Sequence, residues 1–575
     1  MVNAKVALFC AVLLNFASYA QQNSFKTRFE ISNKTESASY FEGIKWWNKL
    51  DSAFSEVRMQ EFGMTDAGYP LQIVTLSSTS TDWKTNKNKS VILINNAIHP
   101  GEPDGVDASM LLFRDILFKH QQLLDSCFIV CIPYYNIGGA LNRNNHSRAN
   151  QLGPVEYGFR GNAQNLDLNR DFVKCDSRNA QSFAKLLQLL DPDVYIETHV
   201  SNGADYRYNI TYLSTQPDKI GGVMGTYLRF NFIPGLEKKM ATKNNEMVPY
   251  VNHHSGPLLD SYTTFYDSPR YSSGLTTLHS IYGFITETHM LKPFEIRVIS
   301  TFDYLLSSIE YCSEHSSEIK QSRQEQKHAI ANAKSFALDW KLDETTFNKM
   351  KFKGYEHGYK KSKVTGANRL YYDRSKPITK SMDYYGYMIA SKERNKPKAY
   401  LLKRGFVDVE ERLRWNNVAL QELTKDTVIE VVSYLIYAFD TKETAYEKHY
   451  FHSNSLYTAD TISWTFRKGD YLIKTGTDKD RFVVEMLEPD GPDSYFNWNF
   501  FDAILQQKEW YSPYVFEDKA AEYLRNNNTL NQQFLAKKEK DKDFANNARA
   551  QLHWVYTQSQ NYEKEHRRLP IFRIE

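Results

Sequence analysis

One strand-like stretch that ends in a histidine and a glutamate constrains this chain most strongly. Four consecutive aliphatic residues, Val91 to Ile94, lead into a Pro/Gly-rich turn that carries His99 and Glu102. A short aliphatic run that ends in a turn predicts a buried strand, and open α/β sheets place their functional groups at the carboxyl ends of such strands. We therefore expect both residues at the lip of an α/β sheet.

The residue types at these two positions are ones that zinc binds. A neutral imidazole and a carboxylate three positions apart on one turn can face the same ion. Catalytic zinc sites keep three protein ligands and one exchangeable water, so a third ligand is expected downstream. The strand-like run 191–199 supplies it, because it ends in His199 and precedes a Ser/Asn/Gly turn. The residues thus predict a site for one Zn²⁺ ion.

Four motifs occur along the chain, each close to a strand-like segment. They are His99-x-x-Glu102, the run 167–172 (DLNRDF), His199, and the run 282–287 (YGFITE). In this order they resemble the zinc metallocarboxypeptidase family, the funnelins, over roughly residues 40 to 330. The resemblance implies that His99, Glu102 and His199 are zinc ligands, with Glu287 as the general base.

The resemblance also implies a grip on the carboxyl end of a peptide. Asn169 and Arg170 are similar to the pair that binds the terminal carboxylate of the substrate in this family. A bidentate contact between arginine and carboxylate is geometrically selective. The family has Asn-Phe next, whereas this chain has Asp171-Phe172. A carboxylate at position 171 either orients Arg170 or competes with the carboxylate of the substrate.

Two further roles are expected from the family. An arginine ahead of this motif polarises the scissile carbonyl, since a guanidinium offers fixed charge and forked donors to an oxyanion. Arg160 is our choice for that role, and Arg148 is the alternative. A mobile tyrosine is expected some twenty residues before the general base. The tyrosines of that segment are Tyr262, Tyr266 and Tyr271, and Tyr266 is our choice for substrate binding.

Residues 1–20 have the pattern of a secretory signal peptide. Lys5 precedes the apolar run 6–14, and small residues at 17–20 form an A-x-A-like cleavage site. We expect cleavage after Ala20 and a secreted or periplasmic product. The apolar run is too short to span a bilayer, and no later segment reaches about 18 unbroken apolar residues. The mature chain is therefore expected to have no transmembrane segment.

The remaining cysteines are Cys127, Cys131, Cys175 and Cys312. Two of them lie four positions apart on one apolar strand-like run, where they cannot easily bridge. We expect buried free thiols.

Helical and strand-like segments alternate in the first 335 residues. Helical spacing is found at 40–50, 105–117 and 176–190, and strand-like runs at 71–76, 91–94, 127–135 and 191–199. This alternation predicts an α/β fold with a mixed, largely parallel central sheet flanked by helices.

The pattern changes near residue 335, after a polar helical segment at 314–335. Strand-like runs at 397–402, 428–432, 471–474 and 481–486 then predict a C-terminal β-rich accessory domain, and the mixed-charge segment 536–547 predicts a solvated helix. The expected organisation is a signal peptide (1–20), a zinc carboxypeptidase-like catalytic domain (21–335) and the accessory domain (336–575).

Composition narrows the classes of function. A net charge of +3 with 24% charged residues does not indicate a nucleic-acid binder. The leading hypothesis is a secreted zinc carboxypeptidase that acts on peptides or proteins. The alternatives are an amidase or endopeptidase on cell-wall peptides, and a non-catalytic binding protein that retains the fold.

Overall fold

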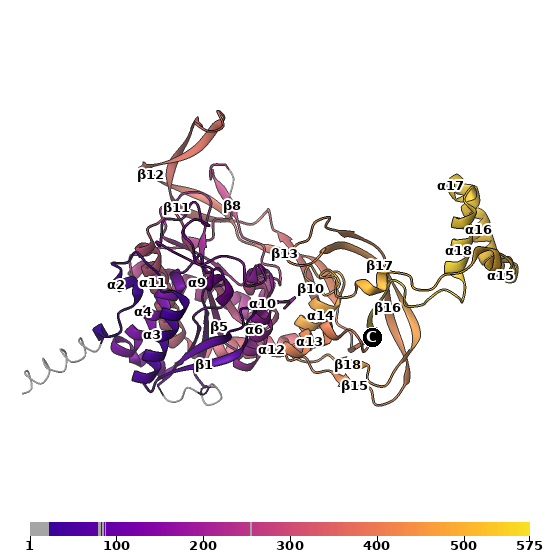
Figure 1. Ribbon diagram of the computed structural model, residues 1–575, viewed down its shortest axis with the longest axis horizontal. Helices are drawn as coiled ribbons and strands as arrows, with labels where there is room; N and C mark the ends of the chain where they lie inside the picture. The colour runs from indigo at the N-terminus through magenta and orange to yellow at the C-terminus, as the bar shows by residue number, and fades with distance from the viewer. Residues whose placement is uncertain (1–21, 79–81, 83–85, 87, 254–255) are drawn as a thin grey trace, which may run out of the picture.

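The computed structural model describes residues 22–78, 82, 86, 88–253 and 256–575 (Figure 1). The expected signal peptide, residues 1–20, lies outside these residues.

An eight-stranded sheet forms the centre of the larger, N-terminal unit. Its spatial order is β1 (Val57–Met64), β2 (Pro70–Leu76), β4 (Cys127–Ile132), β3 (Ser90–Asn95), β5 (Val194–Ser201), β9 (Tyr282–His289), β6 (Ile210–Ser214) and β7 (Val248–Pro249). The four central strands, from β4 to β9, run parallel to one another, while β1, β2 and β6 pair antiparallel with their inner neighbours. The expected mixed α/β fold is confirmed.

Helices cover both faces of this sheet because its strands are apolar on both sides. On one face, α3 (Tyr40–Ala53), α4 (Asp104–Lys119), α9 (Ile233–Thr242) and α11 (Phe294–Glu314) share an apolar core with Ile92 and Ile94. On the other face, α6 (Arg178–Leu190) and α10 (Ser272–Leu278) share a second core with Val91 and Leu93.

Other helices of this unit are α2 (Arg28–Ile31), η2 (Gln121–Asp125), α5 (Ile137–Leu141), η3 (Leu168–Arg170), α7 (Pro217–Ile220), α8 (Gly222–Tyr227), η4 (Leu228–Phe232) and α12 (Ser316–Asn332).

The C-terminal region is rich in β-structure, as expected. Its six-stranded antiparallel sheet has the order β15 (Gln421–Glu422), β18 (Tyr471–Lys474), β14 (Ala399–Leu402), β19 (Arg568–Ile574), β16 (Thr427–Thr441) and β17 (His452–Phe466). Two ribbons precede it: β10 (Ser335–Leu342) pairs with β13 (Met388–Asn395), and β11 (Asn348–Lys361) pairs with β12 (Asn368–Tyr385). Its helices α13 (Val407–Trp415) and α14 (Asp480–Leu487) lie beside the sheet (Figure 1), and a 3₁₀ turn, η5 (Asp502–Leu505), follows them in the chain.

One strand-like run was interpreted wrongly. Residues 481–486 lie in the helix α14, whose eight residues are all buried. A short run that is buried on every side has no periodicity that separates a helix from a strand. The carboxylate of Asp480 accepts hydrogen bonds from the backbone N–H groups of Gly476 (2.8 Å) and Thr477 (3.0 Å), which fixes the turn before the helix.

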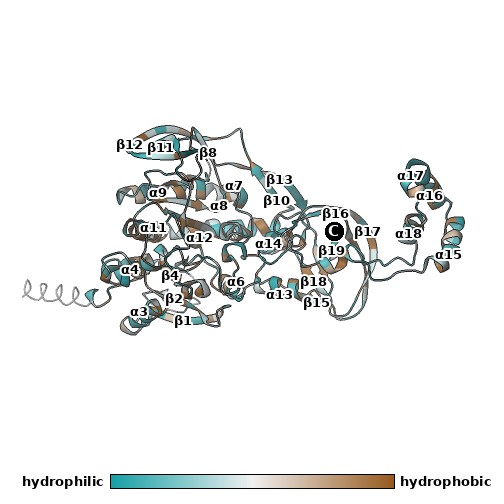
Figure 2. Cartoon of the chain, turned by 45° about the horizontal axis from the view of Figure 1, so that its top comes forward, coloured by the Kyte–Doolittle hydropathy of each residue, from teal (hydrophilic) through white to brown (hydrophobic). Residues whose placement is uncertain are grey.

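A helical module stands at the far end of the molecule (Figures 1 and 2). It consists of α15 (Pro513–Asn526), α16 (Asn528–Lys540), α17 (Lys542–Ala545) and α18 (Ala548–Gln558). The polar segment 536–547 falls within α16 and α17, and most of it is solvent-facing. A small core that includes Phe516, Leu552 and Tyr556 holds the module together.

The two units are packed against each other through one apolar core. The core on the α6 face of the first sheet continues into Tyr400, Val409 and Tyr434 of the C-terminal region. The short strand β8 (Ser261–Thr263) lies in the N-terminal half of the chain but pairs with β12 of the C-terminal region. A division of the chain at residue 335 therefore stays a prediction.

Cys127, Cys131, Cys175 and Cys312 are buried free thiols, as expected. Among the described residues, no helix is both long and apolar enough to cross a membrane.

Candidate active site

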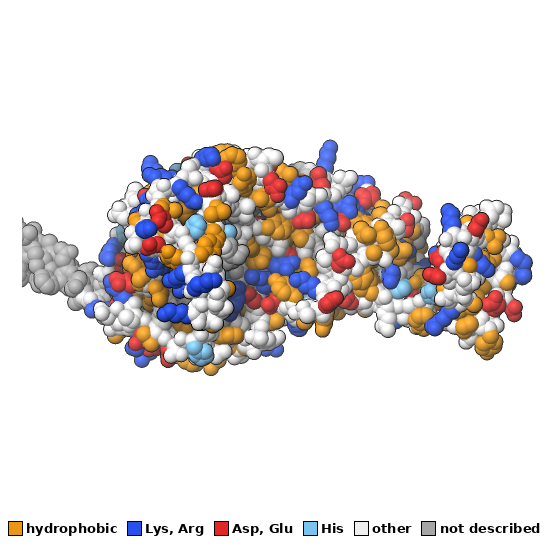
Figure 3. Space-filling view, turned by 90° about the horizontal axis from the view of Figure 1, so that it is seen from above, with side chains coloured by type: hydrophobic (Ala, Val, Ile, Leu, Met, Phe, Trp, Pro, Cys, Tyr) orange, Lys and Arg blue, Asp and Glu red, His pale blue; other side chains and the backbone are white. Residues whose placement is uncertain are grey.

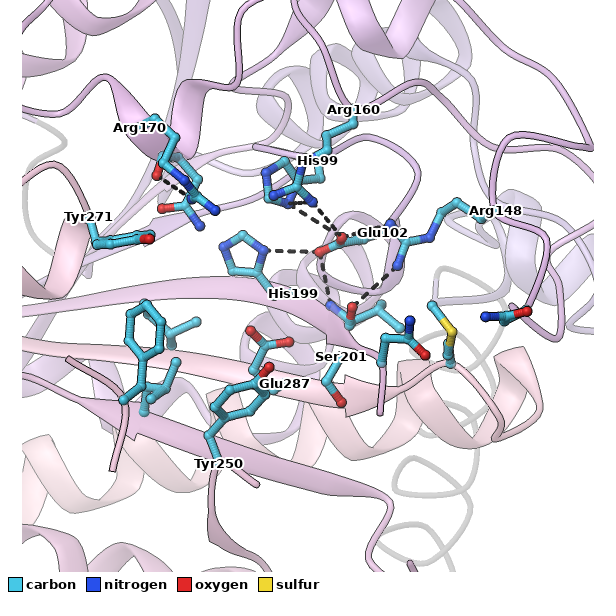
Figure 4. Close-up of a pocket in the computed structure, with 18 of the residues that line it drawn as sticks. His99, Glu102, Arg148, Arg160, Arg170, His199, Ser201, Tyr250, Tyr271 and Glu287 are labelled. Atoms are coloured by element: carbon cyan, nitrogen blue, oxygen red, sulfur yellow. Dashed lines mark hydrogen bonds and ion pairs between the residues drawn. The ribbon is translucent and has the colours of Figure 1, made fainter. Parts of the chain in front are cut away.

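The predicted metal ligands meet at the carboxyl edge of the parallel strands (Figure 4). His99 and Glu102 follow the end of β3, and His199 lies near the end of β5. Glu287 lies on β9 as the register partner of His199, so the two side chains rise from the same face of the sheet. Parallel strands place such groups together at one edge of an open sheet.

The ligand atoms of His99, Glu102 and His199 lie within 4.8 Å of one another, and all three side chains are buried. Glu102 occupies the middle: one carboxylate oxygen is 3.3 Å from Nδ1 of His99, and the other is 2.9 Å from Nδ1 of His199. Each ring therefore turns its Nδ1 atom toward the carboxylate of Glu102.

Each imidazole also contacts a second carboxylate through its Nε2 atom, on the side of the ring that faces away from Glu102. Nε2 of His99 is 2.9 Å from Asp167, and Nε2 of His199 is 2.5 Å from Glu197. Although burial lowers the pKa of His199, its hydrogen bonds with Glu102 and Glu197 raise that pKa to about 10. The negative charge around the two rings thus favours a cation at this place.

This donor set fits a zinc ion. Two imidazole nitrogens and one carboxylate are the ligand types of catalytic zinc, and each imidazole is backed by a carboxylate, as metal-binding histidines usually are. His99, Glu102 and His199 are the residues that would hold the ion.

Glu287 faces the same cavity but is not one of the clustered ligands. Burial raises its pKa to about 8, and the charge of Glu102 adds to this, while His199, Arg148 and Arg160 lower it. A cation nearby favours the ionised form of a carboxyl, which is the form that accepts a proton.

Both candidate arginines flank Glu102. Arg148 donates to the Glu102 carboxylate at 2.8 Å and to the backbone oxygen of Val200 at 3.2 Å. Nη1 of Arg160 lies 3.8 Å from Glu102, and its Nε donates to Asp167 at 2.9 Å. Both guanidinium groups line the cavity, so the structure brings both together with the predicted ligands.

Asn169 and Arg170 also line this cavity, on the 3₁₀ turn η3. The guanidinium of Arg170 lies 4.5 Å from the ring centre of Tyr271 and donates to the backbone oxygen of Asn169 at 2.7 Å. Asp171 turns away from the site: it is fully buried and accepts hydrogen bonds from Lys174 and Ser177. Its carboxylate is thus held elsewhere and does not line the cavity.

The structure does not bring Tyr266 into the cavity. Its hydroxyl donates to Asp339 at 2.6 Å, and Tyr266 is not among the residues that line the cavity. Tyr250, Phe265 and Tyr271 line it instead. The backbone between β8 and α10 is irregular, so spacing along the chain did not show which of its rings faces inward.

The cavity has a volume of about 510 Å³. Its polar part holds the predicted ligands and arginines, and an apolar wall is formed by Leu213, Phe265 and Ile285. Lys and Arg side chains gather around the hollowed middle of this unit in Figure 3.

Among the cavity and supporting residues that were not assigned a role from the sequence are Asp167, Glu197 and Tyr250. A signal existed for Glu197, because it lies two positions before His199 on one strand and so shares its face. Asp167 opens the motif that contains Asn169 and Arg170, but its contact with His99 joins residues far apart in the chain.

Comparison with known proteins bears out the family resemblance. A family model described as zinc carboxypeptidase matches residues 44–202, a range that includes His99, Glu102, Asn169, Arg170 and His199. No curated protein matches the chain.

Solved structures similar to this chain include two bacterial metallo-carboxypeptidases. The one from Burkholderia cenocepacia is 12% identical with a TM-score of 0.37, and the match covers 48% of this chain and 70% of that chain. The one from Pseudomonas aeruginosa, in complex with (2-guanidinoethylmercapto)succinic acid, is 11% identical with a TM-score of 0.37, and the match covers 49% and 70%. Bovine thrombin-activatable fibrinolysis inhibitor, in complex with tick carboxypeptidase inhibitor, is 14% identical with a TM-score of 0.38, and the match covers 49% and 98%.

Proposed function

We propose that this chain, whose residues 44–202 match the zinc carboxypeptidase family, is a zinc-dependent peptidase that releases C-terminal residues from peptides. One observation carries the proposal. His99, Glu102 and His199 converge beside Glu287 in a cavity that also holds Asn169 and Arg170.

The chemistry needs a nucleophile and a stabilised oxyanion. A bound Zn²⁺ would supply a positive charge that lowers the pKa of water toward about 7 and polarises a carbonyl oxygen. Glu287 takes the proton from the attacking water and passes it to the leaving amine, the dual role of a buried carboxylate in such a site. Arg160 or Arg148 donates to the oxyanion of the scissile carbonyl.

The exopeptidase character rests on Arg170 and Asn169. A guanidinium binds a carboxylate through two parallel hydrogen bonds, so Arg170 selects peptides that end in a free carboxylate. Its support comes from Tyr271, against whose ring the guanidinium lies. The apolar wall of Leu213, Phe265 and Ile285 is available to a side chain of the released residue.

Export from the cytoplasm is part of this proposal. It rests on the sequence pattern of residues 1–20, which lie outside the described part of the structure.

The test is metal analysis of the purified chain, followed by mass spectrometry of a mixed peptide pool after incubation. We expect one zinc ion per chain and the loss of single residues from free C-terminal ends, with C-terminally amidated copies of the same peptides left intact. Internal cleavage, or cleavage only of stem peptides that contain D-amino acids, would replace the proposal with an endopeptidase or amidase. A chain that binds no zinc and cleaves no peptide would instead support the alternative of a non-catalytic binding protein that retains the fold.

A further inference from the structure

The turn between β16 and β17 reaches from the C-terminal region to the unit that contains the cavity. Tyr446 and His449 exchange backbone hydrogen bonds of 2.7 and 3.0 Å, so the turn has two central residues. These are Glu447 and Lys448, with φ values of 48° and 77°. Left-handed backbone is unfavourable for residues other than Gly, Asn and Asp, so the surroundings must hold this turn in place.

Two contacts anchor the turn on the segment that contains Asn169 and Arg170. The carboxylate of Glu447 accepts a hydrogen bond from the backbone N–H of Asp167 at 2.9 Å. Nε2 of His449 lies 2.7 Å from the carboxylate of Asp176, which also receives Lys174 at 2.8 Å. The turn is therefore fixed at both ends of residues 167–176.

Asp167 links this contact to the cavity. Its carboxylate receives Nε2 of His99, the backbone N–H of Asn169 and Nε of Arg160, each at 2.9 Å. The side chain of Asp167 thus contacts residues of the cavity, while its backbone N–H donates a hydrogen bond to Glu447 of the C-terminal region. Asp167 is also the N-cap of η3, the turn that presents Arg170, and its side chain accepts the backbone N–H of Asn169 there.

The groups around Glu447 have opposing effects on its pKa. Burial and the charge of Asp167 raise the pKa of Glu447, whereas the hydrogen bond from the Asp167 N–H and the cations Lys174 and Arg170 lower it. Two carboxylates brought together repel each other, so this arrangement persists because nearby donors and cations compensate it.

We propose that Glu447 is a positioning residue for the reaction. Its carboxylate holds the backbone of Asp167 and thereby holds the Leu168–Arg170 turn where the terminal carboxylate of a peptide binds. The C-terminal β-rich region is then part of the substrate-binding end of the enzyme. This inference rests on the proposed release of C-terminal residues.

Three variants distinguish the loss of the Glu447–Asp167 hydrogen bond from a change in the conformation of the turn. Glu447→Asn keeps a residue that tolerates left-handed backbone but is too short to reach the Asp167 N–H. Glu447→Gln keeps both the length and a carbonyl acceptor. Glu443→Ala removes an exposed carboxylate from the same loop and is the matched control.

The enzymatic readout is the kinetics on one peptide with a free carboxyl end and on its amidated copy. We expect Glu447→Asn to raise KM for the free peptide by about tenfold, as the loss of a hydrogen bond to a charged group does, with a much smaller change in kcat. Its preference for the free over the amidated peptide should fall, and its zinc content should stay the same. Glu447→Gln and Glu443→Ala should stay within about twofold of wild type.

Hydrogen exchange of the segment 167–172, measured without substrate, tests the same contact independently of activity. Faster exchange is expected in Glu447→Asn and not in Glu447→Gln or Glu443→Ala. Unchanged exchange and unchanged KM in Glu447→Asn would overturn the role of Glu447, as would an equal loss in Glu447→Gln. A wild-type enzyme that releases no C-terminal residue would instead overturn the proposed function.

Discussion

Nε2 of His99 lies 2.9 Å from the carboxylate of Asp167, and Nδ1 of the same ring faces Glu102 at 3.3 Å. Glu197 stands in the same relation to His199. Each imidazole is thus fixed in tautomer and orientation by an acid on the far side of its ring. At the proposed zinc site we therefore expect metal affinity to depend also on these two outer carboxylates, Asp167 and Glu197.

Glu197→Gln should weaken zinc binding while leaving the three ligands in place. Outer carboxylates of this kind typically contribute 10- to 100-fold to metal affinity, so we expect a loss of about that size. Competition with a chelator of known affinity measures it. Glu422→Gln, which changes an exposed acid of β15, is the control. Equal affinities in both variants would contradict a supporting role for Glu197.

Glu287→Gln should keep its zinc and lose most of its turnover. The substitution removes the base but no ligand, and a general base contributes about 10²- to 10⁴-fold to the rate. Metal content and kcat are measured on the same preparation. His99→Ala serves as the contrast, because it should lose both metal and activity. A Glu287→Gln variant as active as the wild type would refute the assignment of the base.

Arg170→Lys should damage binding of the free carboxyl end in particular. Lysine keeps the positive charge but not the planar fork that grips a carboxylate, so we expect KM for free peptides to rise about tenfold or more. Arg178→Lys alters an exposed arginine nearby and should change nothing. If Arg170→Lys raised KM equally for free and amidated peptides, Arg170 would not be the residue that binds the terminal carboxylate.

Asp107→Asn should stabilise the protein at alkaline pH. Asp107 is fully buried on α4, where it accepts hydrogen bonds from Ser37 and the backbone of Ala38, and burial raises its pKa to about 7. A folded-state pKa above that of the unfolded chain means that stability is lost as pH rises toward 7. The asparagine cannot ionise, so this loss is absent.

Thermal unfolding at two pH values checks this prediction. The gain in Tm of Asp107→Asn over wild type should be larger at pH 8 than at pH 5, since each unit of pKa difference corresponds to about 1.4 kcal/mol. Asp260→Asn, which changes an acid whose side chain is 95% exposed, should show no such trend. A gain that is equal at both pH values would show that ionisation of Asp107 is not its cause.

The predicted metal ligands could be found from the sequence because they lie at or just after the ends of strands. His99 and His199 both follow apolar runs, and parallel strands bring such ends to one edge of the sheet. The helices α3 and α6 were predicted from an apolar stripe that lies on their buried side, whereas α4 was predicted from its recurring apolar residues and is buried on almost every side.

The rest depends on contacts that are not local in the chain. Tyr266 and Tyr271 lie in the same irregular segment, and only packing against Asp339 or Arg170 determines which ring faces the cavity. Glu447 meets Asp167 across 280 positions of sequence, at a turn whose residues are not typical turn residues. Local patterns carry no information about either choice.

The helices α15–α18 leave the six-stranded sheet and return to almost the same point. Arg567 donates its backbone N–H to the oxygen of Ile504 at 2.8 Å, and Glu563 accepts the N–H groups of Lys508 and Glu509. The segments before and after the four helices are therefore joined by hydrogen bonds that do not involve the helices. The entropic cost of closing a loop rises only slowly with the length of the loop. This is where a reporter or a foreign domain can be grafted into the chain while the strands and the cavity keep their form.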